Sequence, residues 1–91
     1  MAYEILNPED FLTDLIFRQD QFMENIAAFD WSRYEFKSVL VKGCNTAIIP
    51  PWALMAITAR LIPQAKSIRF GNEHDNVVVF RRSGRTKGLD L

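Results

Sequence analysis

The order of apolar and polar positions between residues 36 and 70 predicts a strand, a turn, a helix and a second strand. Residues 36–41 are mostly apolar and β-branched, as in a buried strand, and residues 43–46 form the turn. Pro50 and Pro51 favour a helix start, because proline fits the first helical turn but not the interior. The helix over 52–62 is apolar on nearly all sides, so we expect it to be covered on most of its faces. Pro63 ends this helix, and residues 66–70 form the second strand.

The first third of the chain has helical periodicity. Residues 3–6 have the character of an edge strand, and Asn-Pro-Glu-Asp at 7–10 then favours a helix start, with a capping amide, a first-turn proline and two acids. Apolar residues, many of them aromatic, recur at steps of three and four up to residue 26, as expected of core positions. A polar stretch interrupts them, so residues 8–29 form either one long helix or two with a break near Gln19, the second capped by Asp20.

These elements predict a small α/β domain of α+β character over residues 1–82. A strand, a helix and a strand with short connections normally form a parallel unit with the helix on the sheet. Residues 76–82 form a third strand, antiparallel to the second because a short glycine-containing loop at 71–75 joins them. The domain is therefore expected to have one or two N-terminal helices, followed by elements in the order strand-helix-strand-strand. The strands form a mixed sheet of three strands, or of four with residues 3–6. Residues 83–91 are expected to be a flexible basic tail.

Composition and charge narrow the class of protein. A chain of 91 residues is one domain, and a hydrophobic content of 48% is too high for a disordered protein. The longest apolar run, 47–59, contains two prolines and is too short to span a bilayer. The start does not have the pattern of a signal peptide, and a lone cysteine cannot form an internal disulfide. We therefore expect a cytoplasmic protein that is not bound to membranes.

The turn after the first strand of the parallel unit is the predicted ligand site, because ligands bind at the carboxyl ends of such strands beside helix N-termini. It contains Cys44, Asn45 and Thr46, and Trp52 follows in the helix. Cys44 is either a reactive thiol, persulfide carrier or metal ligand, or a small buried residue that ends a strand. His74, the only histidine, either assists Cys44 from the same end of the sheet or belongs to a hydrophilic hairpin loop.

Basic residues are concentrated near the end of the chain. Arg81, Arg82, Arg85 and Lys87 are the candidates for contacts with nucleic acid, and the alternative is a solvated basic terminus. Eleven basic and eleven acidic residues leave no net charge, so the rest of the chain offers nucleic acid little general attraction. The sequence has no phosphate-binding glycine loop, catalytic triad or zinc spacing, so no catalytic residue, metal or cofactor is predicted.

Several segments together resemble domain-of-unknown-function family 2480, a group of uncharacterised bacterial proteins chiefly from the Bacteroidetes. They are FDWSRY at 29–34, VKGC at 41–44, IPPWA at 49–53, LIPQAKSI at 61–68 and FG at 70–71. The Pro-x-Trp-Ala and Leu-x-Pro-x-Ala-Lys segments are fairly specific together and weak alone. The resemblance covers most of the chain, from residue 15 to residue 82.

Family members look like two copies of this unit in tandem, whereas this chain has features of both copies in one. The resemblance thus implies a twofold homodimer that regains the two-lobed arrangement. Family genes tend to lie beside genes for iron–sulfur cluster assembly, which implies a link to that process. The function expected is a non-catalytic binding or assembly-accessory module with a protein partner. The alternatives are a thiol carrier or enzyme that uses Cys44, and a nucleic-acid accessory that uses the basic tail.

Overall fold

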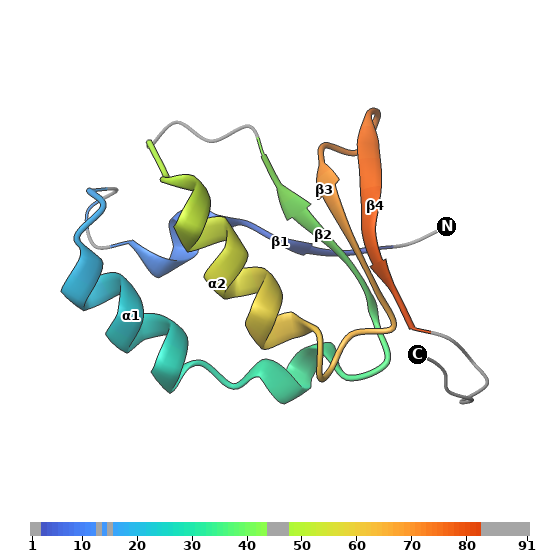
Figure 1. Ribbon diagram of the computed structural model, residues 1–91, viewed down its shortest axis with the longest axis horizontal. Coiled ribbons are helices and arrows are strands. Elements are labelled where there is room, and N and C mark those ends of the chain that lie inside the picture. The colour runs from blue at the N-terminus through green and yellow to red at the C-terminus, as the bar shows by residue number, and fades with distance from the viewer. Residues whose placement is uncertain (1–2, 13, 15, 44–47, 83–91) are drawn as a thin grey trace.

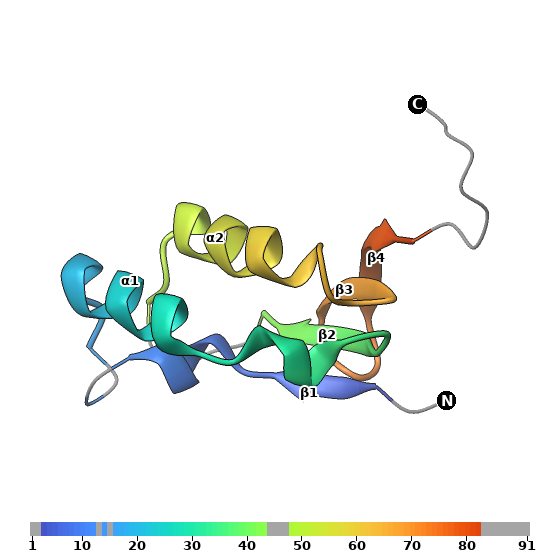
Figure 2. The ribbon, with the colours of Figure 1, turned by 90° about the horizontal axis from the view of Figure 1, so that it is seen from below.

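The computed structural model describes residues 3–12, 14, 16–43 and 48–82. Within them, both α-helices lie on the same side of one four-stranded mixed sheet (Figures 1 and 2), which confirms the predicted small α/β domain. Two 3-10 turns, η1 and η2, lie on either side of α1 in the sequence. The elements in chain order are β1 (Glu4–Leu6), η1 (Pro8–Phe11), α1 (Gln19–Ala28), η2 (Trp31–Tyr34), β2 (Ser38–Lys42), α2 (Pro51–Leu61), β3 (Ser67–Gly71) and β4 (Asn76–Arg81).

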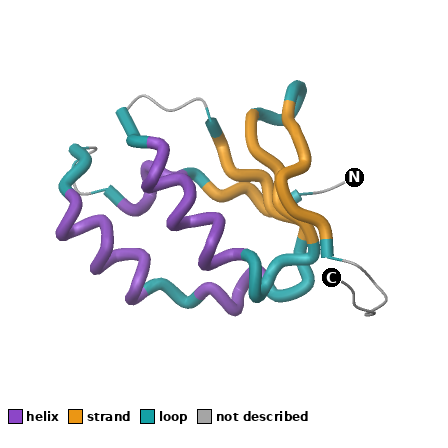
Figure 3. Tube along the Cα trace, viewed as in Figure 1, coloured by secondary structure: helices purple, strands orange, loops and turns teal. Residues whose placement is uncertain are grey.

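The strands lie in the order β1-β2-β3-β4 (Figure 3). Strands β2 and β3 are parallel, with Val39 opposite Ile68, and α2 connects them, as the strand-helix-strand pattern predicts. Strand β4 is antiparallel to β3, as expected for a hairpin. The N-terminal residues add β1 at the other edge, parallel to β2, so the four-stranded alternative is the one observed.

A bulge interrupts the pairing of β3 with β4. Ile68 lies opposite Phe80, but the next residue of β3, Arg69, lies opposite Val78, so Val79 is the extra residue of the pair. Phe80 packs against the core, and Val79 lines a groove together with residues of α2. The bulge therefore places two consecutive side chains of β4 on the side of the sheet that carries the helices.

The N-terminal region contains one α-helix and one 3-10 turn. Asn7 caps η1 as predicted, since its Oδ1 accepts a hydrogen bond from the Glu9 backbone N–H at 3.1 Å. The turn ends at Phe11, and α1 begins at Gln19, where the sequence predicts a break. The N-cap of α1 is Arg18, so the prediction of Asp20 as the cap is wrong. Asp20 lies in the first turn instead, where its carboxylate complements the helix dipole.

The core lies between the helices and the sheet, and aromatic side chains extend it past the sheet edge. Phe11 stacks on Trp31 at 5.5 Å between ring centroids, and the Trp31 Nε1–H donates to the Ile26 carbonyl at 2.7 Å. The core role of the N-terminal aromatic residues is thus confirmed. No helix in the described part of the chain is both long enough and apolar enough to span a bilayer. The most deeply buried positions of this core cluster, each at most 1% exposed, are Phe22, Ile26, Val39, Ala53, Ile57, Leu61, Ala65 and Ile68.

Candidate functional site: an apolar groove beside helix α2

Helix α2 is less covered than its sequence predicts. Its buried residues, Ala53, Ile57 and Leu61, lie at steps of four along one stripe, whereas Met55 is 70% exposed and Ile62 is 39% exposed. The prediction that most of its faces are covered is therefore wrong for the single chain. The reason is the position of α1, which lies along only one flank of α2 (Figure 1).

On that flank the indole ring of Trp52 contacts the rings of Phe17 and Phe22, at 5.5 and 5.8 Å between centroids. The opposite flank of α2 faces β3 and β4, and no other described element lies there (Figures 1 and 3). On this flank the helix-bearing side of the sheet is therefore not covered by any described helix.

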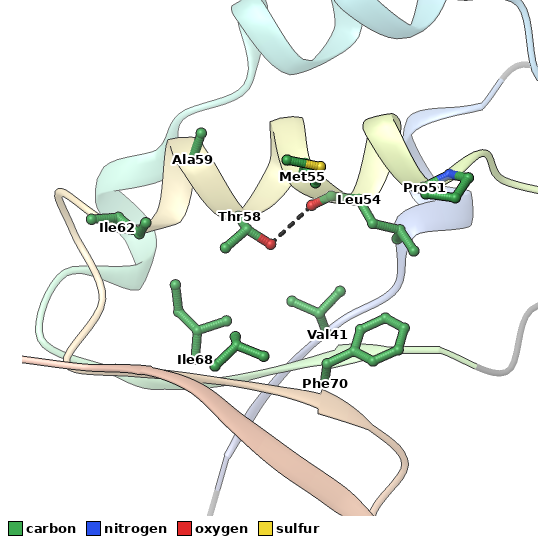
Figure 4. Close-up of a pocket in the computed structure, with 10 residues that line it drawn as sticks. Val41, Pro51, Leu54, Met55, Thr58, Ala59, Ile62, Ile68 and Phe70 are labelled. Carbon is green, nitrogen blue, oxygen red and sulfur yellow. Dashed lines mark hydrogen bonds between the residues drawn. The ribbon is translucent and has the colours of Figure 1, made fainter.

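An apolar groove of ≈ 490 Å³ lies along this uncovered flank (Figure 4). Side chains of α2 form one wall, and side chains of β2, β3 and β4 form the floor. The volume is within the range of about 300–1,000 Å³ that is usual for ligand sites. The lining residues are Val41, Pro51, Leu54, Met55, Thr58, Ala59, Ile62, Ile68, Phe70 and Val79.

The groove offers almost no polar group to an occupant. Among the described residues, Thr58 is the one lining residue with a polar side chain, and its Oγ1 hydroxyl donates to the Leu54 carbonyl at 2.9 Å, within the same helix (Figure 4). Sites for small substrates usually combine an apolar lining with a few polar groups that fix the orientation of the ligand. The groove therefore fits the apolar surface of another chain better than a polar substrate.

Two exposed valines of the edge strand contribute to this apolar surface, Val79 within the groove and Val77 beyond its lining. Val77 is 59% exposed and Val79 is 51% exposed, and Val79 owes its position to the bulge. Sequence reasoning did not predict this groove, although the apolar composition of α2 on all sides was the signal for it. A helix with this composition needs two covered flanks, and the described part of the chain covers one.

The predicted ligand site falls largely outside the described residues. Three of its residues, Cys44, Asn45 and Thr46, lie outside the described residues, so the hypothesis of a reactive thiol stays a prediction. The described residues on either side confirm that the end of β2 meets the β3–β4 turn: the Gly43 N–H donates to the Gly71 carbonyl at 2.9 Å, and Lys42 Nζ lies 3.0 Å from Glu73 Oε1. The hydrogen bond from Lys42 lowers the pKa of the Glu73 carboxyl.

The other two predicted site residues, His74 and Trp52, lie in a hairpin turn and in an aromatic cluster. His74 is exposed in the β3–β4 turn, and Asn72 Oδ1 accepts hydrogen bonds from the backbone N–H groups of His74 and Asp75, both at 2.8 Å. Such bonds shape a hairpin turn, as in the structural alternative for this loop. Trp52 packs against the aromatic residues on the α1 flank. In the part of the chain that is described, no group of three metal-ligating side chains occurs.

The predicted basic cluster is only partly described, because Arg85 and Lys87 lie outside the described residues. Arg82 is held against the end of α2: its Nε donates to the Ala65 carbonyl at 3.2 Å and its Nη2 donates to the Ile62 carbonyl. A cation in this position complements the helix dipole. Arg81 is exposed at the end of β4. The nucleic-acid hypothesis stays a prediction.

Comparison with known proteins gives one match. The family model described as "Protein of unknown function (DUF2480)" matches residues 3–83 of the chain. No curated protein and no solved structure matches it.

Proposed function

The chain belongs to the DUF2480 family of proteins of unknown function, and we propose that it is a non-catalytic binding and assembly module that pairs with a second copy of itself. The observation that carries the proposal is the apolar groove beside α2, whose lining exposes hydrocarbon side chains and one methionine but no unsatisfied polar side chain. Contiguous exposed apolar surface of this kind marks sites of association between chains.

A second copy fits the groove because α2, which forms one wall of the groove, is also the helix whose flank is uncovered. Helix α2 is apolar on both flanks, and one flank alone is packed, against α1. If the α2 helices of two copies lie side by side, each covers the open flank of the other and the exposed valines of its β4. Such a contact is reciprocal, as a twofold axis requires. The homodimer also restores the two-lobed arrangement that the family resemblance implies.

The proposed setting is the bacterial cytoplasm, where the homodimer acts as an accessory in iron–sulfur cluster maturation. The support for this process is the gene neighbourhood of the family. The partner in that role is an assembly protein, and the paired groove forms the core of the module that presents the remaining surface to it.

Replacing Met55 by glutamate is expected to dissociate the dimer. Met55 is 70% exposed in the single chain, so the substitution leaves the fold intact, but it places a carboxylate in the middle of an apolar contact. We expect at least a hundredfold weaker association, which corresponds to about 3 kcal/mol. Light scattering after gel filtration measures this directly: the unmodified chain gives twice 10.5 kDa, and the Met55→Glu variant gives 10.5 kDa.

Met23→Glu is the matched control, because Met23 is 41% exposed on α1 and does not line the groove. This variant keeps the mass of the dimer. If the two variants have equal masses at a protein concentration at which the unmodified chain is a dimer, the interface does not lie in the groove.

A further inference from the structure

A second pocket, of ≈ 250 Å³, lies where β2 and β3 begin and β4 ends. Ser38 and Arg69 line it, and they alternate along their strands with Val39 and Ile68, whose side chains lie in the core. Because successive side chains of a strand point to opposite sides, this pocket opens on the side of the sheet away from the helices. We call it the basic pocket; its lining is Tyr3, Ser38, Lys66, Ser67, Arg69, Arg81 and Arg82.

The charge of this lining is one-sided in a chain with no net charge. Four of the nine basic residues in the described part of the chain line the basic pocket, and no acidic residue does. Like charges brought together repel one another, so such a cluster without a counter-charge raises the free energy of the empty site and favours a bound anion.

Two of the cations are held in place. Arg69 Nη1 donates to Asn76 Oδ1 at 2.9 Å, and its guanidinium lies over the Tyr3 ring at 5.5 Å, across the intervening strand β2. Arg82 is fixed by its bonds to two carbonyls after α2. A guanidinium has five N–H donors, so each arginine retains donors for a ligand. Fixed donors lose little side-chain entropy when they bind.

The other groups of the pocket are available to a ligand. Within the described part of the chain, Lys66 and Arg81 have neither an ion pair nor a side-chain hydrogen bond. Ser67 Oγ donates to Ser38 Oγ at 3.1 Å, which leaves the Ser38 hydroxyl hydrogen free to be donated outward. The pocket thus combines fixed arginines, two unpaired cations and a hydroxyl donor.

We propose that the basic pocket binds the phosphate group of a small molecule. Arginine forks and lysine ammonium groups together match the three oxygens and double charge of a phosphate monoester. The pocket is smaller than the roughly 300–1,000 Å³ of sites for drug-sized ligands, so it holds the phosphate and little more of the molecule. It lies on the opposite side of the sheet from the groove, so this site does not depend on the proposed dimer.

Titration of the ¹⁵N-labelled full chain with inorganic phosphate tests the proposal, with sodium chloride lowered to keep the ionic strength constant. We expect saturating shifts of the amide signals of Ser38, Ser67 and Arg69. The Lys66→Gln and Arg81→Gln variants each bind phosphate at least about tenfold more weakly, because each loses a charge-assisted contact. Arg18→Gln removes the same charge at the start of α1 and leaves the affinity unchanged. The spectra also show that each variant is folded.

Shifts that do not saturate, or that are equal in Arg81→Gln and Arg18→Gln, overturn the proposal. Phenyl phosphate and a ten-nucleotide thymidine strand are titrated in parallel to distinguish a phosphorylated small molecule from a nucleic-acid backbone. Phenyl phosphate is expected to bind at least as tightly as inorganic phosphate and to shift the same amide signals. Binding of the strand about a hundredfold tighter than either, with a steep dependence on salt, overturns the small-molecule assignment.

Discussion

Replacement of Phe22 by alanine is expected to lower the free energy of unfolding by about 3–5 kcal/mol. Phe22 is 1% exposed on α1, and its ring contacts the rings of Phe11, Phe17 and Trp52. Its removal leaves a cavity where α1 meets both η1 and α2. A domain of this size is stable by roughly 5–14 kcal/mol, so the loss removes a large part of the total. Urea unfolding at one fixed protein concentration measures it, since the stability of a dimer depends on concentration.

Phe36→Ala is the matched control for this change. Phe36 is 70% exposed, and alanine keeps the Cβ at its φ of 59°, so neither burial nor backbone strain changes much. The expected effect is within about 0.5 kcal/mol. If the two alanine variants have the same unfolding midpoint, Phe22 does not hold α1 in the core as described.

The second large effect is expected at Gly71, where alanine should lower the free energy of unfolding by about 2–4 kcal/mol. Gly71 has a φ of 140°, which side chains rarely allow, and an added Cβ would lie 2.4 Å from the Asp75 carbonyl oxygen and 2.8 Å from Asn76 Cα. Both neighbours are backbone atoms of the β3–β4 turn and cannot move without opening the hairpin. Urea unfolding and the amide spectrum of β4 report the change.

Gly43→Ala provides the comparison at the neighbouring strand. There an added Cβ would approach the Phe70 ring at 2.8 Å, and a half-buried ring can rotate away where backbone cannot. We expect a loss of about 1 kcal/mol or less. A loss at Gly71 as small as the one expected at Gly43 would show that the turn tolerates a rearranged backbone at Gly71.

Much of the sheet could be predicted from local patterns. The proline pair where α2 begins, the short connections and the apolar strands were enough for the parallel pair and the hairpin, because each depends on residues close in sequence. The bulge at Val79 could not be predicted, since it depends on how β4 fits against β3. The extent of η1 was also missed. Its cap and first turn favour a helix, yet packing of Phe11 on Trp31, far along the chain, ends it after one turn.

The functional surfaces were harder to predict than the fold. The turn after β2 was predicted as the ligand site because ligands bind at the carboxyl ends of parallel strands beside helix N-termini, whereas the groove consists of ordinary apolar residues that any core contains. Only the position of α1 on one flank of α2 shows that these residues are uncovered. The basic pocket brings together residues from both ends of the chain, Tyr3 and Arg81 among them, and no spacing along the sequence signals it.

The groove and the basic pocket lie on opposite sides of the sheet, and the lining of the groove is apolar whereas that of the pocket is positively charged. Among the described residues, no charged residue lines the groove on the helix-bearing side, and no acidic one lines the basic pocket. Self-association on one side would therefore leave the other side accessible in the proposed dimer. A module of this kind can pair through its groove and still bind a phosphate in each copy.

Nuclear Overhauser effects between copies are the most direct test of whether α2 of a second copy fills the groove. The sample mixes uniformly ¹³C-labelled chain with unlabelled chain. If α2 of a second copy fills the groove, isotope-filtered cross-peaks connect the Met55 methyl group with methyl protons of the unlabelled copy. We expect none from Met23, which lies on α1 outside the groove. Cross-peaks from Met55 that arise only within its own chain, in a sample at millimolar concentration, would contradict it.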